Sequence, residues 1–276
     1  MLPTKFWAEM SWRDFAAADM SKVVAVLPVA AIEQHGPHLP VGVDMFINEG
    51  YFATAIESIP DDMPVLILPI QAIGKSNEHI EYPGTLTFSL ETIVRAWTEI
   101  GDSVARAGCR KLIFMNSHGG NVPVIDAVVR ELRVRHRMLA VHAAWHRLGY
   151  PADLFSAQER AHGIHGGEAE TSLMLAFKPK TVRMSEARNF VSSAIAIEQE
   201  FQQLRVTQPI GFGWMASDLT ELGAAGDAAS ATAAKGEACA ENAAEAFLNL
   251  LRDVLAFDLA RLGQGPLAGP KGPSAP

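Results

Sequence analysis

Four short runs of apolar residues, separated by polar segments and by stretches with helical spacing, constrain the fold of this chain most strongly. The runs cover residues 23–29, 64–70, 111–115 and 138–144. Such runs are typical of strands that are buried on both faces, and their alternation with helices predicts parallel strands joined by right-handed crossovers. The sequence therefore predicts a layered α/β/α fold with a mostly parallel central sheet. In such a fold, ligands bind at the carboxyl ends of the strands.

Helices are expected between and after these runs. Ser89 occupies an N-cap position, apolar residues then repeat at helical spacing, and Gly108 ends the segment. Asn121 is a second candidate N-cap. The predicted helices cover residues 45–59, 90–107, 122–135, 168–178 and 233–262. Residues 151–161 look irregular, and residues 180–222 carry no clear pattern.

One domain is expected over residues 1–262. It is followed over residues 263–276 by a Gly/Pro-rich segment, which has little apolar surface to bury and is expected to be flexible.

Composition excludes several classes of protein. The net charge is −8 and no Lys/Arg-rich block occurs, which argues against nucleic-acid binding. No run of eighteen apolar residues predicts a membrane span, and the first residues do not resemble a signal peptide. Cys109 and Cys239 form neither a CxxC motif nor a disulfide framework. We expect them to be reduced thiols and the protein to be cytoplasmic.

The first predicted strand is followed by four potential metal ligands within twelve residues, namely Glu33, His35, His38 and Asp44. Glu33 and His35 are two residues apart, so they point the same way in an extended segment. Glycines and prolines between the others force an irregular loop that lets Asp44 fold back. Carboxylates and imidazoles suit zinc, manganese or iron(II) better than calcium. The alternative is a plain surface loop with polar residues.

Two further polar clusters follow later elements. His118 stands between the third run and two glycines, where a metal site or a plain Gly-rich turn are the alternatives. Glu170 shares a helical stripe with Leu173, Met174 and Phe177, and a carboxylate on a core-facing stripe needs a cation or hydrogen-bond partners. Glu168 lies on roughly the opposite side of that helix and is expected at the surface.

Five segments then occur in one order along the chain. They are residues 33–40 with Asp44, 74–85, 116–121, 165–172 and 226–236. In residue types and order they resemble the motifs of the creatininase (creatinine amidohydrolase) family, over roughly residues 20–250. The resemblance implies a creatininase-like α/β fold around a mostly parallel sheet. It also implies a homo-oligomer, with creatininase itself a hexamer, and two divalent metal ions, zinc first, with manganese or iron as alternatives.

The resemblance also assigns roles to residues. It implies that Glu33, His35, Asp44 and His118 bind metal, with Asp44 bridging the two ions. The last ligand of creatininase is a glutamate at the position of Gly120, and in other branches of the family the glutamate matching Glu170 replaces it. His165 matches the proton-transfer histidine. Ser76 and His79 match a loop that lines the substrate pocket. His38 is expected to support the ligands rather than to bind metal.

The implied chemistry is hydrolysis of a carbon–nitrogen bond by a metal-activated water, with His165 protonating the leaving nitrogen. We expect a small cyclic amide, lactam or formamide as the substrate rather than a peptide. One alternative is creatinine itself, but Gly120 and the absence of a Trp–Asp pair near His162 weigh against it. The others are a metallopeptidase acting on a short peptide, which an open pocket would favour, and a non-enzymatic binder of small ligands. The complete ligand set argues against the binder.

Overall fold

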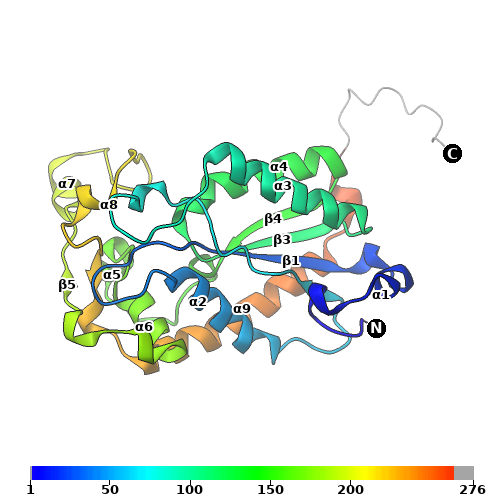
Figure 1. The fold of residues 1–276 in the computed structure, drawn as a ribbon, viewed down its shortest axis with the longest axis horizontal. Coiled ribbons are helices and arrows are strands. Elements are labelled where there is room, and N and C mark those ends of the chain that lie inside the picture. Colours follow the sequence, from blue (N-terminus) through cyan, green and yellow to red (C-terminus); the bar gives the residue numbers. More distant parts are fainter. Residues whose placement is uncertain (1, 264–276) are drawn as a thin grey trace.

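The computed structural model describes residues 2–263 and contains a four-stranded parallel sheet between two layers of helices (Figure 1). The strands are β1 (Val24–Val29), β2 (Val65–Ile67), β3 (Lys111–Asn116) and β4 (Leu139–Ala144), in the order β2-β1-β3-β4. This confirms the predicted fold class and the strand in each apolar run. Every residue of β1 and β3 is buried, as a central pair of strands requires. β2 is shorter than the run that predicts it.

Side chains alternate between the two faces of the sheet, and each face is covered by its own helices. Val24 and Val26 of β1 join the core under α2 (Val43–Ile56), α6 (Glu168–Phe177) and α9 (Ala233–Ala256). Ala25 and Leu27 point the other way, toward α3 (Leu90–Arg106) and α4 (Val122–His136). Figure 1 shows these two layers above and below the strands. Burying each large apolar side chain contributes about 1.5–3 kcal/mol, so the two cores stabilise the sheet between its helices.

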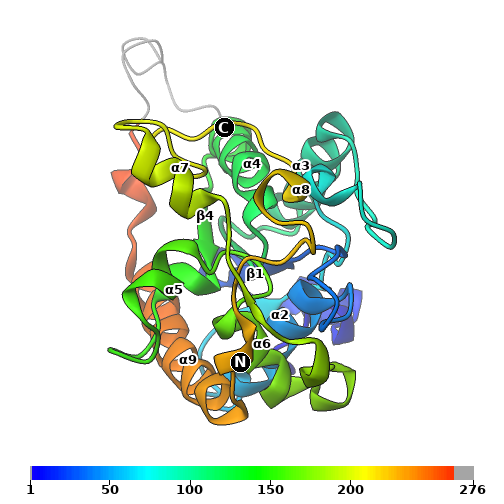
Figure 2. The same cartoon turned by 90° about the vertical axis from the view of Figure 1, so that its left-hand side faces the viewer.

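Short elements gather at the carboxyl ends of the strands, the end that faces the viewer in Figure 2. They are α5 (Ala157–His162), α7 (Ala194–Glu200), α8 (Ala216–Leu219) and the antiparallel pair β5 (Asn189–Phe190) and β6 (Gly226–Asp227). Helix α1 (Trp12–Ala17) lies near the opposite end. The prediction that residues 151–161 are irregular is therefore partly wrong, because α5 begins at Ala157 and covers the end of this segment. Strand β5 and helices α7 and α8 all lie within residues 180–222, where no element is predicted.

Single turns of 3-10 helix complete the described chain. They are η1 (Trp7–Glu9), η2 (Met20–Lys22), η3 (Asn77–His79), η4 (Gly119–Asn121), η5 (Trp145–Leu148), η6 (Pro179–Thr181), η7 (Met184–Glu186), η8 (Ala228–Ser230) and η9 (Leu259–Arg261).

The predicted helix ends are partly right. Ser89 is the N-cap of α3, its hydroxyl accepting a hydrogen bond from Thr92 N at 3.3 Å. Asn121 is the N-cap residue of α4, as expected, but its side chain makes no hydrogen bond to that helix. Its amide is used elsewhere, donating to Ala30 O at 3.0 Å and accepting from Lys75 N at 2.9 Å. Helix α9 ends at Ala256, before the predicted residue 262, because Phe257 turns to an extended conformation.

Three further predictions concern membrane spans, the cysteines and the end of the chain. Within residues 2–263, no helix is both long enough and apolar enough to cross a membrane. Cys109 and Cys239 are both buried and form no disulfide in this described part. The Gly/Pro-rich tail predicted over residues 263–276 lies outside the described residues from position 264 onward.

Candidate active site

The five predicted metal ligands meet at the carboxyl end of the sheet. His118 Nδ1 lies 3.2 Å from Glu33 Oε1 and 3.6 Å from Asp44 Oδ2. His35 Nε2 lies 3.8 Å from Asp44 Oδ1 and 3.7 Å from Glu170 Oε2. Asp44 therefore turns one oxygen toward each histidine, between a Glu33–His118 half and a His35–Glu170 half. Such an arrangement can share one carboxylate between two cations.

The start of α2 holds Asp44 in this place. Gly42 precedes the helix and Asp44 stands in its first turn. One turn later Asn48 is fully buried, and its amide donates to Val29 O at 3.0 Å and to Met115 O at 3.3 Å. These bonds fasten the helix to the ends of β1 and β3. The loop that was expected to fold Asp44 back is thus completed by the first turn of α2. Nothing in the local sequence pattern around Asn48 indicates its supporting role.

Three ligand atoms in this cluster are buried without a hydrogen-bond partner within the described residues. They are Glu33 Oε1, His35 Nε2 and Asp44 Oδ2. A buried polar atom left unpaired costs about 1–3 kcal/mol, and most such atoms in proteins are paired. Glu33, His35 and Asp44 also form a group whose potential ligand atoms all lie within 4.8 Å of one another. Carboxylate oxygens and imidazole nitrogens are donors that suit zinc, manganese or iron(II), so these residues fit a divalent cation.

The pKa shifts in the cluster also favour a bound cation. Burial and the nearby charge of Glu33 raise the pKa of Asp44 well above its ordinary value. Burial likewise raises the pKa of Glu170, against the opposing effect of His165. Burial lowers the pKa of His35 far below its ordinary value, and the neighbouring His165 lowers it further. The half that contains His35, Asp44 and Glu170 therefore disfavours both anionic acids and a cationic imidazole, and a divalent cation would relieve this imbalance. In the other half, against the effect of burial, His118 lowers the pKa of Glu33 and Glu33 raises the pKa of His118 to about 10, so these two form an ion pair that a cation would replace.

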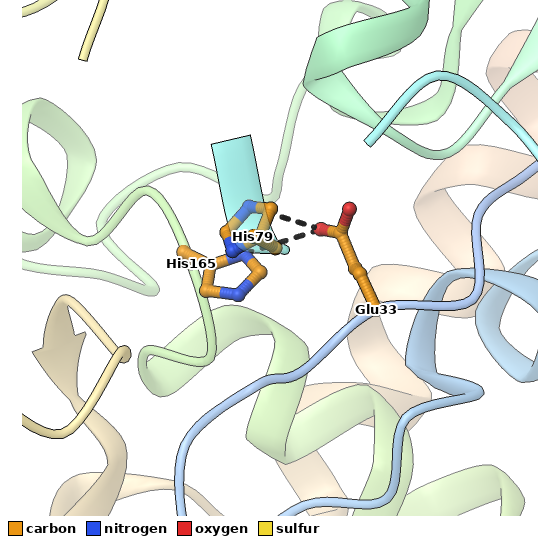
Figure 3. Close-up of side chains that lie close together, drawn as sticks. All are labelled: Glu33, His79 and His165. Carbon is orange, nitrogen blue, oxygen red and sulfur yellow. Dashed lines mark ion pairs between the residues drawn. The ribbon is translucent and has the colours of Figure 1, made fainter. Parts of the chain in front are cut away.

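His165 lies against this cluster between two other imidazole rings. Its ring centroid is 4.0 Å from that of His35 and 4.2 Å from that of His79. Its Nδ1 is 3.6 Å from Glu33 Oε1, and its Nε2 is 2.6 Å from Gln34 O. Because a carbonyl only accepts, Nε2 carries the proton and Nδ1 is free to exchange one. Figure 3 shows His79 and His165 stacked, both beside Glu33.

The loop from Gly74 to Thr85 supplies the two residues expected to bind substrate. His79 is buried against the cluster, with Nε2 3.4 Å from Glu33 Oε1, and burial and His165 lower its pKa to about 3. It therefore stays neutral near neutral pH. Ser76 is fully buried and its hydroxyl donates to Glu33 Oε2. His79 lines the cavity described next, whereas Ser76 is absent from its described lining and holds Glu33 in position.

A cavity of about 540 Å³ opens above the cluster. Glu33, Asp44, His118, His165 and Glu170 form its polar floor. Its apolar wall comes from α3, α4, the segment between α5 and α6, and the segment before α8. It consists of Leu90, Pro123, Val124, Ile164, Phe212 and Trp214. The site thus combines ligand-capable residues with room for an organic molecule.

Two further buried residues support the cluster, namely Gln34, to which the sequence pattern assigns no role, and His38. Gln34 Nε2 lies 2.9 Å from both His79 Nδ1 and Gly223 O, so it ties the histidine loop to the segment before β6. His38 was expected to support the ligands. Its Nε2 lies 3.0 Å from Gly166 O and 2.9 Å from Thr171 Oγ1, next to the start of the helix that carries Glu170.

The prediction that Glu168 lies at the surface is wrong. Its side chain is 7% exposed and its carboxylate pairs with Lys235 Nζ from α9. Glu170 faces the cavity as expected, with Oε2 accepting from Gly166 N at 2.6 Å. The helical stripe correctly separated the two carboxylates. It failed for Glu168 because α9, more than sixty residues later, covers that side of α6.

The two glutamates should respond differently to substitution. Glu170→Gln is expected to weaken metal binding, because it removes a charged oxygen 3.7 Å from His35 Nε2. Glu168→Gln should keep the metal but lose about 1–3 kcal/mol of stability, the usual cost of leaving a buried group without its partner. Metal content and urea unfolding of both variants measure this. Equal metal loss in the two variants would show that the roles are misassigned.

Comparison with known proteins adds to this geometry. The creatininase family, described as creatinine amidohydrolase, matches residues 8–251. The mycofactocin precursor peptide peptidase of Mycolicibacterium smegmatis is 32% identical over 216 residues, covering 78% of this chain and 78% of that protein. The creatinine amidohydrolase of Pseudomonas putida is 32% identical over 195 residues, covering 66% and 75%. A solved structure of creatininase with manganese covers 92% of this chain and 99% of its own, at 24% identity and a TM-score of 0.71, which shows a shared fold.

Proposed function

The chain belongs to the creatininase family, and we propose on this premise that it is a metal-dependent hydrolase of amide carbon–nitrogen bonds. One observation carries the proposal. Glu33 Oε1, His35 Nε2 and Asp44 Oδ2 are buried and lack hydrogen-bond partners within the described residues. The three residues offer ligand atoms within 4.8 Å of one another, next to a cavity that Glu33 and Asp44 line. A site that served only stability would pair these atoms with one another or with the backbone.

The proposed metal centre has two halves. Glu33 and His118 form one, His35 and Glu170 form the other, and Asp44 contributes an oxygen to each. Zinc suits this donor set best, and manganese or iron(II) are alternatives. When bound, such cations polarise a carbonyl and lower the pKa of a water molecule enough to make it a nucleophile near neutral pH.

The residues around the centre supply orientation and a proton. Ser76 holds Glu33 through a hydrogen bond. The backbone carbonyl of Gln34 and the stacked ring of His79 hold His165. An amide nitrogen is a poor leaving group unless it is protonated. His165 faces the cavity and has its Nδ1 free of hydrogen bonds within the described residues. This nitrogen can therefore take a proton from the attacking water and then give it to the leaving nitrogen.

Two substrate classes suit the cavity. The first is a small cyclic amide, lactam or formamide, with creatinine as a less favoured member. The second is a short peptide. The cavity volume of about 540 Å³ favours the short peptide. This volume lies within the range of pockets that hold drug-sized ligands and exceeds what a single small ring fills. The apolar wall with Leu90, Phe212 and Trp214 suits an apolar side chain of such a peptide. The similarity to a peptide peptidase supports the same class.

A substrate panel tests the proposed function. The protein is stripped with a chelator and reloaded with zinc or manganese. It is then incubated with creatinine, a five-membered lactam, an N-formyl amine and peptides of two to five residues with apolar ends. Mass spectrometry should detect hydrolysis of an amide bond in at least one class, lost on chelation and restored by metal. Absence of cleavage in every class by the reloaded protein would contradict the proposal.

Assembly of the protein into a homo-oligomer, such as a hexamer, stays a prediction.

A further inference from the structure

A carboxylate outside the predicted ligand set lies behind His118. Glu78 belongs to the 3-10 turn η3, and its side chain is 18% exposed. Its Oε1 lies 3.6 Å from His118 Nε2, and Lys75 O lies 2.9 Å from the same nitrogen. The other ring nitrogen, Nδ1, faces Glu33 and Asp44. One edge of the imidazole therefore faces the ligand cluster, and the opposite edge faces a backbone carbonyl and a carboxylate.

Glycine at position 120 makes room for this carboxylate. A Cβ atom on Gly120 would lie 2.2 Å from Glu78 Oε1 and 2.5 Å from both His118 Nε2 and Lys75 O. All three separations are far shorter than van der Waals contact. A side chain at this position would displace Glu78 from His118. Gly120 and Glu78 thus form one arrangement, in which the missing side chain of one residue gives space to the carboxylate of the other.

We propose that Glu78 is a positioning residue of the metal centre that acts through His118. An imidazole that binds a cation through one nitrogen donates the hydrogen on its other nitrogen to an acceptor, which fixes the ring and makes it a stronger ligand. Lys75 O accepts that hydrogen directly. The Glu78 carboxylate adds a negative charge at 3.6 Å, where burial keeps solvent from screening it. Glu78 also lines the cavity and offers a ligand atom within 4.8 Å of those of Glu33 and His118, so the test has to separate support of the ring from direct metal binding. This inference rests on the proposed metal site.

Glu78→Gln tests the role with little change of shape. Metal affinity is measured by competition with a chromophoric chelator. It should fall roughly 10–100-fold, the usual effect of removing a residue that supports a ligand, while the number of ions bound at saturation stays the same. Glu78→Asp, which keeps the charge, should bind metal more tightly than Glu78→Gln. The matched control is Glu81→Gln. Glu81 is exposed on the same loop and accepts a hydrogen bond from Ser217, and its substitution should leave the affinity unchanged.

Each other result overturns the inference. An unchanged affinity in Glu78→Gln would mean that its charge does not act on His118. Loss of one ion at saturation would make Glu78 a ligand instead. Equal weakening in the Asp and Gln variants would remove the role of the charge. If the wild-type protein binds no metal, the proposed function fails together with this inference. If the wild type binds metal and the metal affinity of Glu78→Gln is unchanged, only this inference is contradicted.

Discussion

His165→Ala is expected to lower the turnover of an amide substrate by roughly 10²–10⁴-fold while leaving the metal content unchanged. This is the usual scale for loss of a general acid or base. His165 stacks between His35 and His79, and its Nε2 is committed to Gln34 O. Its remaining nitrogen faces the cavity. Turnover and elemental analysis of the variant, beside the wild type, measure both parts of this expectation.

The leaving group separates proton transfer from positioning. Hydrolysis of an amide needs a proton on nitrogen, whereas an activated ester with a leaving group of low pKa does not. His165→Ala should therefore lose far less activity on such an ester than on an amide of the same acyl group. An equal loss on both would leave His165 only a positioning role. Metal loss would instead make it a ligand, since His165 also lies within ligand-forming distance of His35 and Glu170.

Asp44→Asn is expected to abolish metal binding and hydrolysis together. One oxygen of Asp44 faces His118 and the other faces His35, so its charge serves both halves of the centre. The affinity should fall by more than the roughly 10–100-fold expected for a residue that only supports a ligand. Chelator competition and the turnover of the best substrate measure these losses. Retention of tight binding in the variant would contradict the assignment of Asp44.

The same substitution should have the opposite effect on the stability of the metal-free protein. Burial and Glu33 raise the pKa of Asp44 above its ordinary value, so the folded state binds its proton more tightly than the unfolded state. Such a group stabilises the fold below its ordinary pKa, and that contribution is lost as the pH rises through the folded-state value. At neutral pH the metal-free carboxylate is therefore a cost that Asn removes. Thermal unfolding without metal should show Asp44→Asn at least as stable as the wild type. A lower melting temperature would mean that Asp44 stabilises the fold by itself.

The sequence predicts the sheet well because each strand coincides with a local run of apolar residues. The run over residues 23–29 is apolar throughout, as a strand buried on both faces must be, and β1 forms there. The convergence of Glu33, Asp44 and His118 also follows, because parallel topology brings the ends of β1 and β3 together. The expectation that Glu170 lies on an inward stripe of its helix agrees with its place in the cavity.

Features that depend on distant partners could not be predicted. Glu168 is buried because Lys235 reaches it from α9, and no periodicity within α6 reveals that contact. The side chain of Asn121, the N-cap residue of α4, hydrogen-bonds to the backbone of two other loops instead of to its own helix. Glu78 lies beside His118 only because η3 folds under the turn that contains Gly120. In each case the determining contact joins residues far apart along the chain.

Elemental analysis of the protein, purified without chelator and compared with Asp44→Asn prepared in the same way, tests the central claim most directly. We predict about two transition-metal ions per chain in the wild type, one for each half of the cluster, and almost none in the variant. Calcium in place of a transition metal, no metal in the wild type, or equal metal in both proteins would contradict the account.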